Sequence, residues 1–425
     1  MDILDEIVAA QKRGEARGIT SICSANPSVL EAVILHAQSH QSPLLIESTC
    51  NQVNQFGGYI GMRPHEFVRY LGEIVDRLDF PREDLIIGGD HLGPEVWQAE
   101  PAETAMEKAR VLVRDYIRAG YLKIHLDASM KLGGDPEGPL SSEIAAGRAA
   151  DLAWVAEDAY NQGGIDVAPR YVIGTEVPVP GGARENESHL QVTQVTDAAR
   201  TIEATRQAFY KQGLESAWER VIALVVQPGV EFGDGFVLDY DPQAAADLSA
   251  FIEGTDLVYE AHSTDYQTSN ALRQMVADHF AILKVGPALT YAYREAVFAL
   301  AMMEIALVPE ARCSNLIETL DYVMLANPTY WRKYYLGDQR EQRFARQFSY
   351  SDRSRYYWTN PALQSALNRL FQNLREHPIP LSLLSQYLPV QYARIRCGSL
   401  SLTPDEIIKD KIMDLLQDYY SAAQP

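Results

Sequence analysis

The sequence lacks several patterns that mark common protein classes. Its four cysteines, Cys23, Cys50, Cys313 and Cys397, stand far apart with no C-x-x-C pair. We therefore expect neither a disulfide framework nor a structural zinc site, and reduced thiols suit the cytoplasm. No apolar run approaches the roughly 20 residues that cross a bilayer. No G-x-G-x-x-G follows the first apolar run and no P-loop is present, which argues against dinucleotide binding and against a kinase.

Positive charge is also scarce. The 425-residue chain carries 37 Lys and Arg against 57 Asp and Glu, a formal net charge of −20. Nucleic acids and anionic membranes bind clustered Lys and Arg, so we expect neither as a partner. A small anionic substrate needs only a few local cations and is not excluded. The first 18 residues have the pattern of a charged amphipathic helix rather than a signal peptide, and we expect a globular protein of the cytoplasm.

Short runs rich in Val, Ile and Leu recur along the first 290 residues, each followed by a turn and a helical pattern. Eight such runs begin at residues 18, 43, 84, 121, 170, 220, 256 and 280. Each gap holds one crossover helix, which predicts parallel strands. Helical periodicity is clear in 64–78, 102–120 and 141–160. Eight strand–helix units predict an α/β fold, a (β/α)₈ TIM barrel over residues 1–305.

The strand pattern stops after about residue 305. The remaining residues, 306–425, are rich in aromatic side chains and helical in pattern, and no low-complexity linker precedes them. We predict a C-terminal α-helical extension packed on the barrel. Two roles stay open for it, a cap on the barrel or an interface. An interface would allow the chain to form a homo-oligomer.

Polar side chains stand at the carboxyl end of every predicted strand, where barrel enzymes keep their active sites. His125 with Asp127, and Glu260 with His262, are two residues apart, so each pair faces one side of its strand, the barrel interior. Carboxylates buried there must be paired or metal-bound. With His91, three histidines predict a site for a divalent metal ion, Zn²⁺ or Mn²⁺. The strand-end candidates are Ser24, Glu47, Asn51, Gln52, Asn54, Gln55, Asp90, His91, His125, Asp127, Glu176, Gln227, Glu260, His262 and Lys284.

Simpler interpretations of two of these residues stay open. His125 can be a hydrogen-bonded core residue that Asp127 holds in place. Lys284 has apolar neighbours, so burial could lower its pKa and make it a Schiff-base amine. We favour instead an ion pair between Lys284 and Glu260 on the adjacent strand.

The loops offer ligands for a sugar and for a phosphate. The segment 51–62, NQVNQFGGYIGM, combines side-chain amides with glycines, which suits sugar hydroxyls or a mobile lid. Barrel phosphate sites commonly form in the loops after strands 7 and 8. The substrate-binding candidates are Glu47, Gln52, Asn54, Gln227, Glu260 and Lys284. The phosphate candidates are Ser263, Thr264 and the Gly286 backbone, with Arg353 and Arg355 of the extension as further anion-binding residues.

Seven segments together resemble one known family. They are 51–62 (NQVNQFGGYIGM), 88–94 (GGDHLGP), 123–130 (KIHLDASM), 171–182 (YVIGTEVPVPGG), 225–232 (VVQPGVEF), 259–268 (YEAHSTDYQT) and 283–290 (LKVGPALT). They look like the tagatose-bisphosphate aldolase Z-type subunit family of galactitol and N-acetylgalactosamine catabolism. The resemblance continues into the tail and covers nearly the whole chain. It implies one of two activities: a non-catalytic subunit that supports a class II aldolase, or a 4-epimerase that interconverts tagatose 6-phosphate and fructose 6-phosphate.

The family also resembles class II aldolases, barrels with a divalent metal and an adjacent Asp–His pair. That resemblance implies that His91 binds the metal and that Asp90 exchanges a proton with the C4 oxygen of the sugar. It makes His262 the next ligand and leaves the third as His125 or Glu176.

Epimerisation at C4 of a 2-ketose has a specific chemical requirement. This carbon is β to the carbonyl, so its hydrogen is not acidic, and the reaction needs either transient oxidation or cleavage of the C3–C4 bond. Without a dinucleotide fingerprint we favour retro-aldol cleavage and re-addition, with Asp90 on one face and Asp127 or Glu176 assisting on the other. We therefore favour a metal-dependent ketohexose-phosphate 4-epimerase over a subunit that stabilises a class II tagatose-1,6-bisphosphate aldolase.

Overall fold

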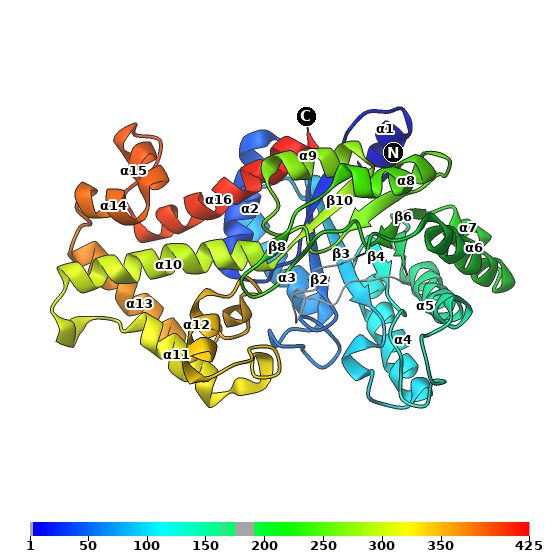
Figure 1. The fold of residues 1–425 in the computed structure, drawn as a ribbon, viewed down its shortest axis with the longest axis horizontal. Helices are drawn as coiled ribbons and strands as arrows, with labels where there is room; N and C mark the ends of the chain where they lie inside the picture. Colours follow the sequence, from blue (N-terminus) through cyan, green and yellow to red (C-terminus); the bar gives the residue numbers. More distant parts are fainter. Residues whose placement is uncertain (1–2, 165, 175–190, 425) are drawn as a thin grey trace.

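The computed structural model describes residues 3–164, 166–174 and 191–424. Eight parallel strands in these residues close into one barrel, in the order β1-β10-β9-β6-β5-β4-β3-β2 (Figure 1). The strands are β1 (Ile19–Ile22), β2 (Leu44–Thr49), β3 (Leu85–Leu92), β4 (Lys123–Leu126), β5 (Arg170–Ile173), β6 (Val221–Val226), β9 (Val258–Ala261) and β10 (Phe280–Val285). This confirms the predicted (β/α)₈ barrel, with each of the eight predicted runs forming one strand.

Helices follow the strands and cover the outside of the barrel, as Figure 1 shows. They are α2 (Pro27–His40), α3 (Pro64–Arg77), α4 (Ala102–Arg118), α5 (Ser142–Gly163), α6 (Val195–Lys211), α7 (Glu215–Trp218), α8 (Pro242–Glu253) and α9 (Ser269–Ala277), with short 3₁₀ turns η1 (Arg82–Asp84) and η2 (Glu95–Trp97). The helical patterns at 64–78, 102–120 and 141–160 correspond to α3, α4 and α5.

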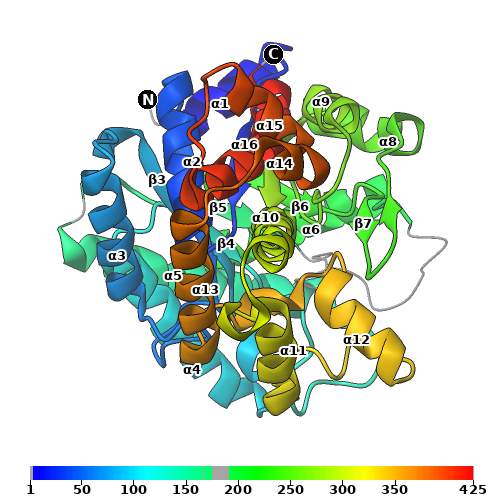
Figure 2. The same cartoon turned by 90° about the vertical axis from the view of Figure 1, so that its left-hand side faces the viewer.

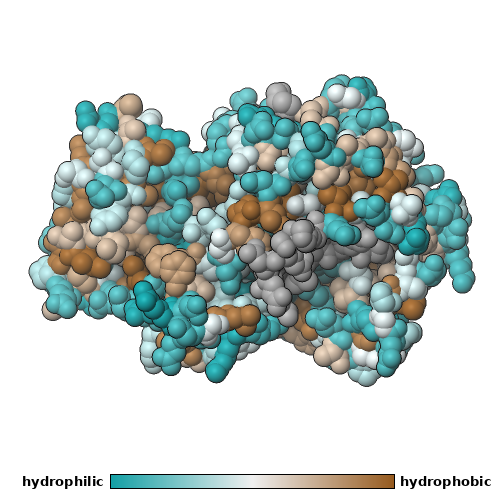
Figure 3. Space-filling model, in the orientation of Figure 1, coloured by the Kyte–Doolittle hydropathy of each residue, from teal (hydrophilic) through white to brown (hydrophobic). Residues whose placement is uncertain are grey.

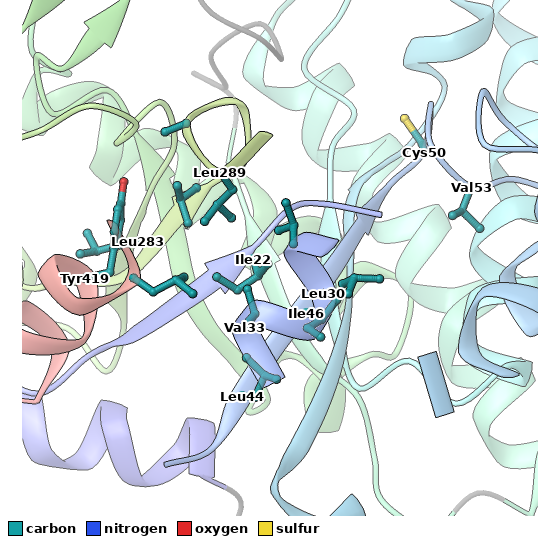
Figure 4. Packing of buried hydrophobic residues seen from close by; sticks show 14 of the residues in the cluster. Ile22, Leu30, Val33, Leu44, Ile46, Cys50, Val53, Leu283, Leu289 and Tyr419 are labelled. Carbon is teal, nitrogen blue, oxygen red and sulfur yellow. The ribbon is translucent and has the colours of Figure 1, made fainter. Parts of the chain in front are cut away.

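Alternate residues of each strand face the helices and the lumen. Figure 4 shows the outward set of β1 and β2, Ile22, Leu44 and Ile46, packed on Leu30 and Val33 of α2. A second apolar cluster fills the lumen at the amino-terminal end of the strands, and α1 (Ile3–Lys12) closes this end with two of its side chains. The cluster contains Leu4, Ile7, Ile19, Leu45, Ile86, Val172, Val258 and Ile282.

The lumen becomes charged toward the carboxyl ends of the strands. Two residues beyond the apolar positions, the inward residues are Glu47, Glu260 and Lys284, joined by Lys123 of β4, and each is at most 5% exposed. The period of two that builds the barrel therefore also gathers charge at one of its ends.

The predicted C-terminal helices are present. They are α10 (Pro287–Leu307), α11 (Leu316–Ala326), α12 (Gln339–Phe348), α13 (Pro361–Glu376), α14 (Leu381–Tyr387), α15 (Pro389–Arg396) and α16 (Pro404–Ala423), with 3₁₀ turns η3 (Glu310–Arg312), η4 (Pro328–Tyr330) and η5 (Arg353–Tyr356). Helix α10 runs outward from the barrel, and α11 to α15 gather on that side (Figures 1 and 2). The domain boundary expected at residue 305 falls inside α10 and stays a prediction.

The last helix, α16, returns to the barrel wall. It packs against α2, α9 and α10 and touches β1. The Tyr419 hydroxyl donates a hydrogen bond of 2.8 Å to the Thr264 carbonyl, and the Gly18 N–H donates one of 2.8 Å to the Ala423 carbonyl. Because α10 leaves the barrel, α16 fills the place between α9 and α2 in the helix layer. The barrel is thus completed by residues more than 100 positions after its last strand.

One short hairpin lies outside the repeating pattern. A hairpin of β7 (Glu231–Phe232) and β8 (Val237–Leu238) follows β6, and strands of two residues are too short for a sequence pattern to predict.

On the face in Figure 3, hydrophilic residues are interspersed with small hydrophobic groups. Among the helices of the described residues, none is long and apolar enough to span a membrane.

Gly93 gives the first testable prediction. A Cβ at this position would overlap the carbonyl oxygen of Asp127, a backbone atom that cannot move aside cheaply. We expect Gly93→Ala to lower the free energy of unfolding in urea by about 3 kcal/mol or more. The control is Gly147→Ala in α5, whose Cβ meets nothing within 4 Å and which should be neutral or stabilising by up to about 1 kcal/mol. Equal losses in the two variants would contradict the steric argument.

Candidate active site at the carboxyl ends of the strands

A pocket opens at the carboxyl end of the barrel, between the strand ends, the loop after β2 and turn η5. Its lining residues are Cys23, Thr49, Asn51, Gln52, Tyr59, Asp90, His91, Phe232, His262, Ser263, Asp265, Lys284, Val285, Gly286, Pro287, Arg355 and Tyr356. Residues from the first strand to the C-terminal extension thus meet in one place. The sequence-predicted residues among them are Asn51, Gln52, Asp90, His91, His262, Ser263, Lys284, Gly286 and Arg355.

Asp90 and His91 are neighbours in β3, and both side chains reach one buried cluster. The pairing of β3 with β4 is irregular between Gly89 and Leu92, and His91 has a left-handed φ of 48°. Such a bulge interrupts the alternation of a strand, so two consecutive side chains can share the lumen. The left-handed backbone at His91 itself, rather than a flexible glycine, directs both side chains into the lumen.

The glycines before this pair provide space. A Cβ at Gly88 would lie 2.7 Å from Cγ of Glu47, and one at Gly89 would lie 2.7 Å from Cδ1 of Tyr116. Neither glycine has a left-handed φ. Their role is close approach: Gly88 lets the buried Glu47 side chain lie against β3, and Gly89 leaves room for Tyr116.

Three imidazoles form a nearly equilateral triangle in the lumen. The ring centroids of His91, His125 and His262 are 5.0 to 5.2 Å apart. Together with Asp90 they offer four buried ligand atoms within 4.8 Å of one another. Nε2 of His125 is buried and has no hydrogen-bond partner among the described residues. A divalent cation would satisfy this nitrogen, so the donor set fits Zn²⁺ or Mn²⁺.

A carboxylate contacts each of these rings, and Nδ1 of His125 lies 3.1 Å from Oδ1 of Asp90 within the cluster. The other two rings are held by carboxylates from outside the cluster. Nδ1 of His91 lies 2.8 Å from Oδ2 of Asp127, and Nε2 of His262 lies 2.9 Å from Oε1 of Glu260. A carboxylate bound to one ring nitrogen sets the tautomer and turns the other nitrogen toward a metal. Asp127 and Glu260, both predicted for the site, therefore act on it through the imidazoles.

The two oriented imidazoles differ in proton affinity. Burial lowers the pKa of His91, but the carboxylates of Asp90 and Asp127 outweigh it and raise that pKa to about 9. Burial and the Lys284 cation lower the pKa of His262 to about 3. At neutral pH His262 is thus a free ligand, whereas His91 must release a proton to bind a metal.

A buried network of charges lies beside the imidazoles. Nζ of Lys123 lies 2.5 Å from Oε1 of Glu47 and 2.5 Å from Oε2 of Glu260. Nζ of Lys284 lies 3.0 Å from Glu47 and 3.5 Å from Glu260, and it also contacts Asp90. The expected pairing of Lys284 with Glu260 is therefore present, within a larger network that balances buried cations with carboxylates.

Comparison with known proteins agrees with the family resemblance of the sequence. A model of the family described as D-tagatose-1,6-bisphosphate aldolase subunit GatZ/KbaZ-like matches residues 4–424. The chain belongs to this family. A crystal structure of a probable tagatose 6 phosphate kinase from Sinorhizobium meliloti 1021 is 47% identical, with a TM-score of 0.88, covering 96% of this chain and 100% of that one.

Two aldolases are also similar to this GatZ/KbaZ-like chain, at lower levels. The YdjI aldolase from Escherichia coli K12 is 12% identical with a TM-score of 0.43, and the match covers 89% of this chain and 96% of that one. Fructose-bisphosphate aldolase from Campylobacter jejuni is 13% identical with a TM-score of 0.45, and the match covers 88% and 92%.

Other predicted residues of this GatZ/KbaZ-like chain have local hydrogen bonds. The Thr264 hydroxyl is buried and donates to the Lys284 carbonyl at 2.6 Å. The Asn54 amide donates to the Cys50 carbonyl at 2.9 Å. Oε1 of Gln227 accepts the Gly229 N–H at 2.8 Å. Thr264, Asn54 and Gln227 do not line the pocket and instead stabilise the loops around it.

The two predicted arginines lie in different places. Arg355 lines the pocket, whereas Arg353 lies behind it, where its guanidinium donates to the Tyr330 carbonyl at 3.2 Å and stacks on Tyr334. Glu176, predicted as a catalytic residue and alternative ligand, lies outside the described residues.

Sequence reasoning missed Lys123 and Tyr59. Lys123, His125 and Asp127 alternate along β4 and the residue after it, so the same period of two that selected the last two also indicates Lys123. Tyr59 comes from the loop after β2 and meets Tyr356 of the extension, with ring centroids 4.7 Å apart. No local pattern predicts that contact.

His262 tests the metal site. We expect His262→Ala to weaken Zn²⁺ binding by at least about tenfold, because it removes a ligand that is neutral at pH 7. Competition with a chromophoric chelator measures the affinity. His279→Ala is the matched control, since this buried histidine bonds Oε1 of Gln11 at 2.9 Å outside the imidazole cluster. If both variants bind Zn²⁺ as the wild type does, the triangle is not the metal site.

Proposed function

We propose that this chain is a metal-dependent ketohexose-phosphate 4-epimerase that interconverts D-tagatose 6-phosphate and D-fructose 6-phosphate by retro-aldol cleavage and re-addition. Asp90, His91, His125 and His262 converge in one buried cluster, and this convergence carries the proposal. Asp90, His91 and His262 of this cluster line the pocket. A set of buried imidazoles and carboxylates is costly to desolvate, and a purely supporting subunit has no use for it.

The three imidazoles would hold the divalent ion. When bound there, it supplies Lewis-acid stabilisation of the negative charge that develops on the sugar oxygens. Asp127 and Glu260 act as positioning residues, because each holds one of these rings by a hydrogen bond. Although burial raises the pKa of Glu260, Lys123 and Lys284 hold that pKa well below its usual range, so Glu260 stays ionised.

Asp90 is the residue that moves the proton. It lines the pocket, and although burial raises its pKa, His91 and Lys284 hold that pKa well below its usual range. Asp90 is therefore a carboxylate at neutral pH, able to accept the proton of O4 as the C3–C4 bond breaks. It returns this proton after the aldehyde has rotated and the bond has formed on its other face. Glu176 remains the proposed carboxylate for the opposite face.

Substrate contacts come from the pocket rim. We assign Gln52 to the sugar hydroxyls and Lys284 to an oxygen near the reacting carbons, since both side chains line the pocket. Arg355 and Ser263 are the proposed phosphate ligands. Lys284 does not act as a Schiff-base amine in this scheme. Burial lowers its pKa, but Asp90 and Glu47 outweigh burial and raise it well above its usual range.

One assay tests the proposal directly. Purified protein is incubated with fructose 6-phosphate and Zn²⁺ or Mn²⁺, without any aldolase, and again after chelation. We expect tagatose 6-phosphate to form only with metal present, detected by NMR or chromatography. No product with any divalent metal would overturn the proposal.

A second function is supported by the family description and by the surface. The family is described as a subunit of an aldolase. Helices α10 to α12 expose four large hydrophobic side chains, Ile305, Tyr322, Leu325 and Phe344. We propose as the alternative that this face binds a class II tagatose-1,6-bisphosphate aldolase and stabilises it. The alternative predicts no epimerisation alone, together with an increase in aldolase activity or thermal stability when the two proteins are mixed.

A further inference from the structure

The loop after β9 places a carboxylate where an anion would otherwise bind. Asp265 lines the pocket and is 3% exposed. Its Oδ1 accepts the N–H of Gly286 at 3.0 Å and that of Ala288 at 2.8 Å, the amides at the start of the 21-residue helix α10. Free amides at such a helix start attract phosphate groups. Here the protein's own carboxylate already occupies them.

The two basic side chains of the pocket differ in whether a carboxylate pairs with them. Lys284 and Arg355 are its permanently charged basic side chains, and Lys284 is neutralised by the buried carboxylates around it. Arg355 donates from Nη1 to the carbonyls of Ser351 and Asp352 and from Nη2 to the Tyr356 hydroxyl. Within the described residues these hydrogen bonds leave its Nε–H free, and no carboxylate oxygen pairs with the guanidinium. Of the two, Arg355 is therefore the one without an ion pair among the described residues.

We infer that the pocket accepts a ketose with a single phosphate, bound at Arg355, and that Asp265 is the specificity-determining residue that excludes a second phosphate. The inference rests on the proposed function, which takes a sugar phosphate as the ligand. Each phosphate monoester carries about −1.5 to −2 charge at pH 7. One guanidinium can balance one such group, whereas a second would be desolvated beside the Asp265 carboxylate, with no other unpaired Lys or Arg of the pocket to bind it.

Binding measurements on the full chain test this inference. Dissociation constants for tagatose 6-phosphate and tagatose 1,6-bisphosphate are measured by calorimetry on the Zn²⁺-loaded wild type and on Asp265→Asn and Asp265→Ser. Epimerisation leaves the number of phosphates unchanged, so turnover does not blur the comparison. We expect the wild type to bind the monophosphate at least about tenfold more tightly than the bisphosphate.

The two variants separate charge from occupancy. Asn keeps an oxygen that accepts the Gly286 and Ala288 amides, so this variant tests the charge and preserves the cap. Ser removes the charge and also frees the amides, so we expect this variant to show the largest gain in affinity for the bisphosphate. The ratio of the two affinities should move toward the bisphosphate by at least about tenfold. The matched control is Asp241→Asn, which changes a carboxylate that accepts the Gln243 N–H at the start of α8, outside the pocket. Its affinity ratio should stay that of the wild type.

The outcomes separate this inference from the proposed epimerase. Tight binding of the monophosphate without any conversion would overturn the epimerase and leave the inference standing. Equal wild-type affinities for the two sugars, or a ratio that neither Asp265 variant changes, would overturn the inference even if the protein turns over.

Discussion

Asp90→Asn is expected to lower kcat for epimerisation by about 100- to 10,000-fold, the usual loss when a general base is removed. An amide has nearly the shape of the carboxylate but cannot accept the O4 proton. Its oxygen can still accept hydrogen bonds from Lys284 and His125, and Lys284 keeps Glu47 and Glu260 as charged partners. We therefore expect the barrel to fold and melt near the wild-type temperature. Initial rates with fructose 6-phosphate and thermal unfolding of the same preparation measure the two quantities.

Asp135→Asn is the control for this variant. Asp135 pairs with Arg148, 3.0 Å from Nη1, on a loop away from the pocket. Its loss removes the same charge from the chain, and kcat should stay near the wild-type value. An Asp90→Asn enzyme as fast as the wild type would show that another group moves the proton.

Lys123→Met is expected to reduce the free energy of unfolding by about 3–5 kcal/mol, the cost of leaving a buried charge without its partner. Lys123, Glu47 and Glu260 are each fully buried, so no water replaces the lost ammonium group. Urea denaturation gives the free energy. The comparison is Lys108→Met, whose pair with Glu100 at 2.6 Å is about one-third exposed and should cost at most about 1 kcal/mol.

The pH dependence of this loss provides a second test. Burial raises the pKa of Glu260, but Lys123 and Lys284 hold it well below its usual range. A carboxyl group with a depressed folded-state pKa stabilises the wild type above its unfolded pKa, and this contribution is lost as the pH falls. The difference between wild type and Lys123→Met should therefore shrink toward acid pH. A loss no larger than that of Lys108→Met at neutral pH would mean that the network contributes little.

Much of the barrel could be predicted because its causes are local. Each strand is a short apolar run between turn residues, and each helix repeats its apolar residues every three or four positions. Strand alternation likewise places His125 and Asp127 on one face, and Glu260 and His262 on another, directly from their spacing along the chain. The partners differ, because Glu260 holds His262 as its spacing indicates, whereas Asp127 holds His91 rather than His125. The same rule also indicates Lys123, which a search of strand ends alone passes over.

Long-range contacts could not be predicted in this way. Tyr356 meets Tyr59, and Tyr419 meets Thr264, across about 155 to 300 positions of sequence, without any periodic signal. Arg355 and Asp265 line one pocket only because the extension folds back onto the barrel, and both bear on how many phosphates the substrate carries.

The (β/α)₈ barrel, its charged carboxyl end and the inward direction of the histidines and carboxylates at the ends of β4 and β9 follow from the order of the amino acids, because strand periodicity sets which side chains face the lumen. Two other features arise only in the folded chain: Asp90 and His91 share one site through the left-handed backbone at His91, and α16 completes the helix layer. Both depend on packing between distant segments, where the energy of burial rather than the preference of any local stretch selects the arrangement.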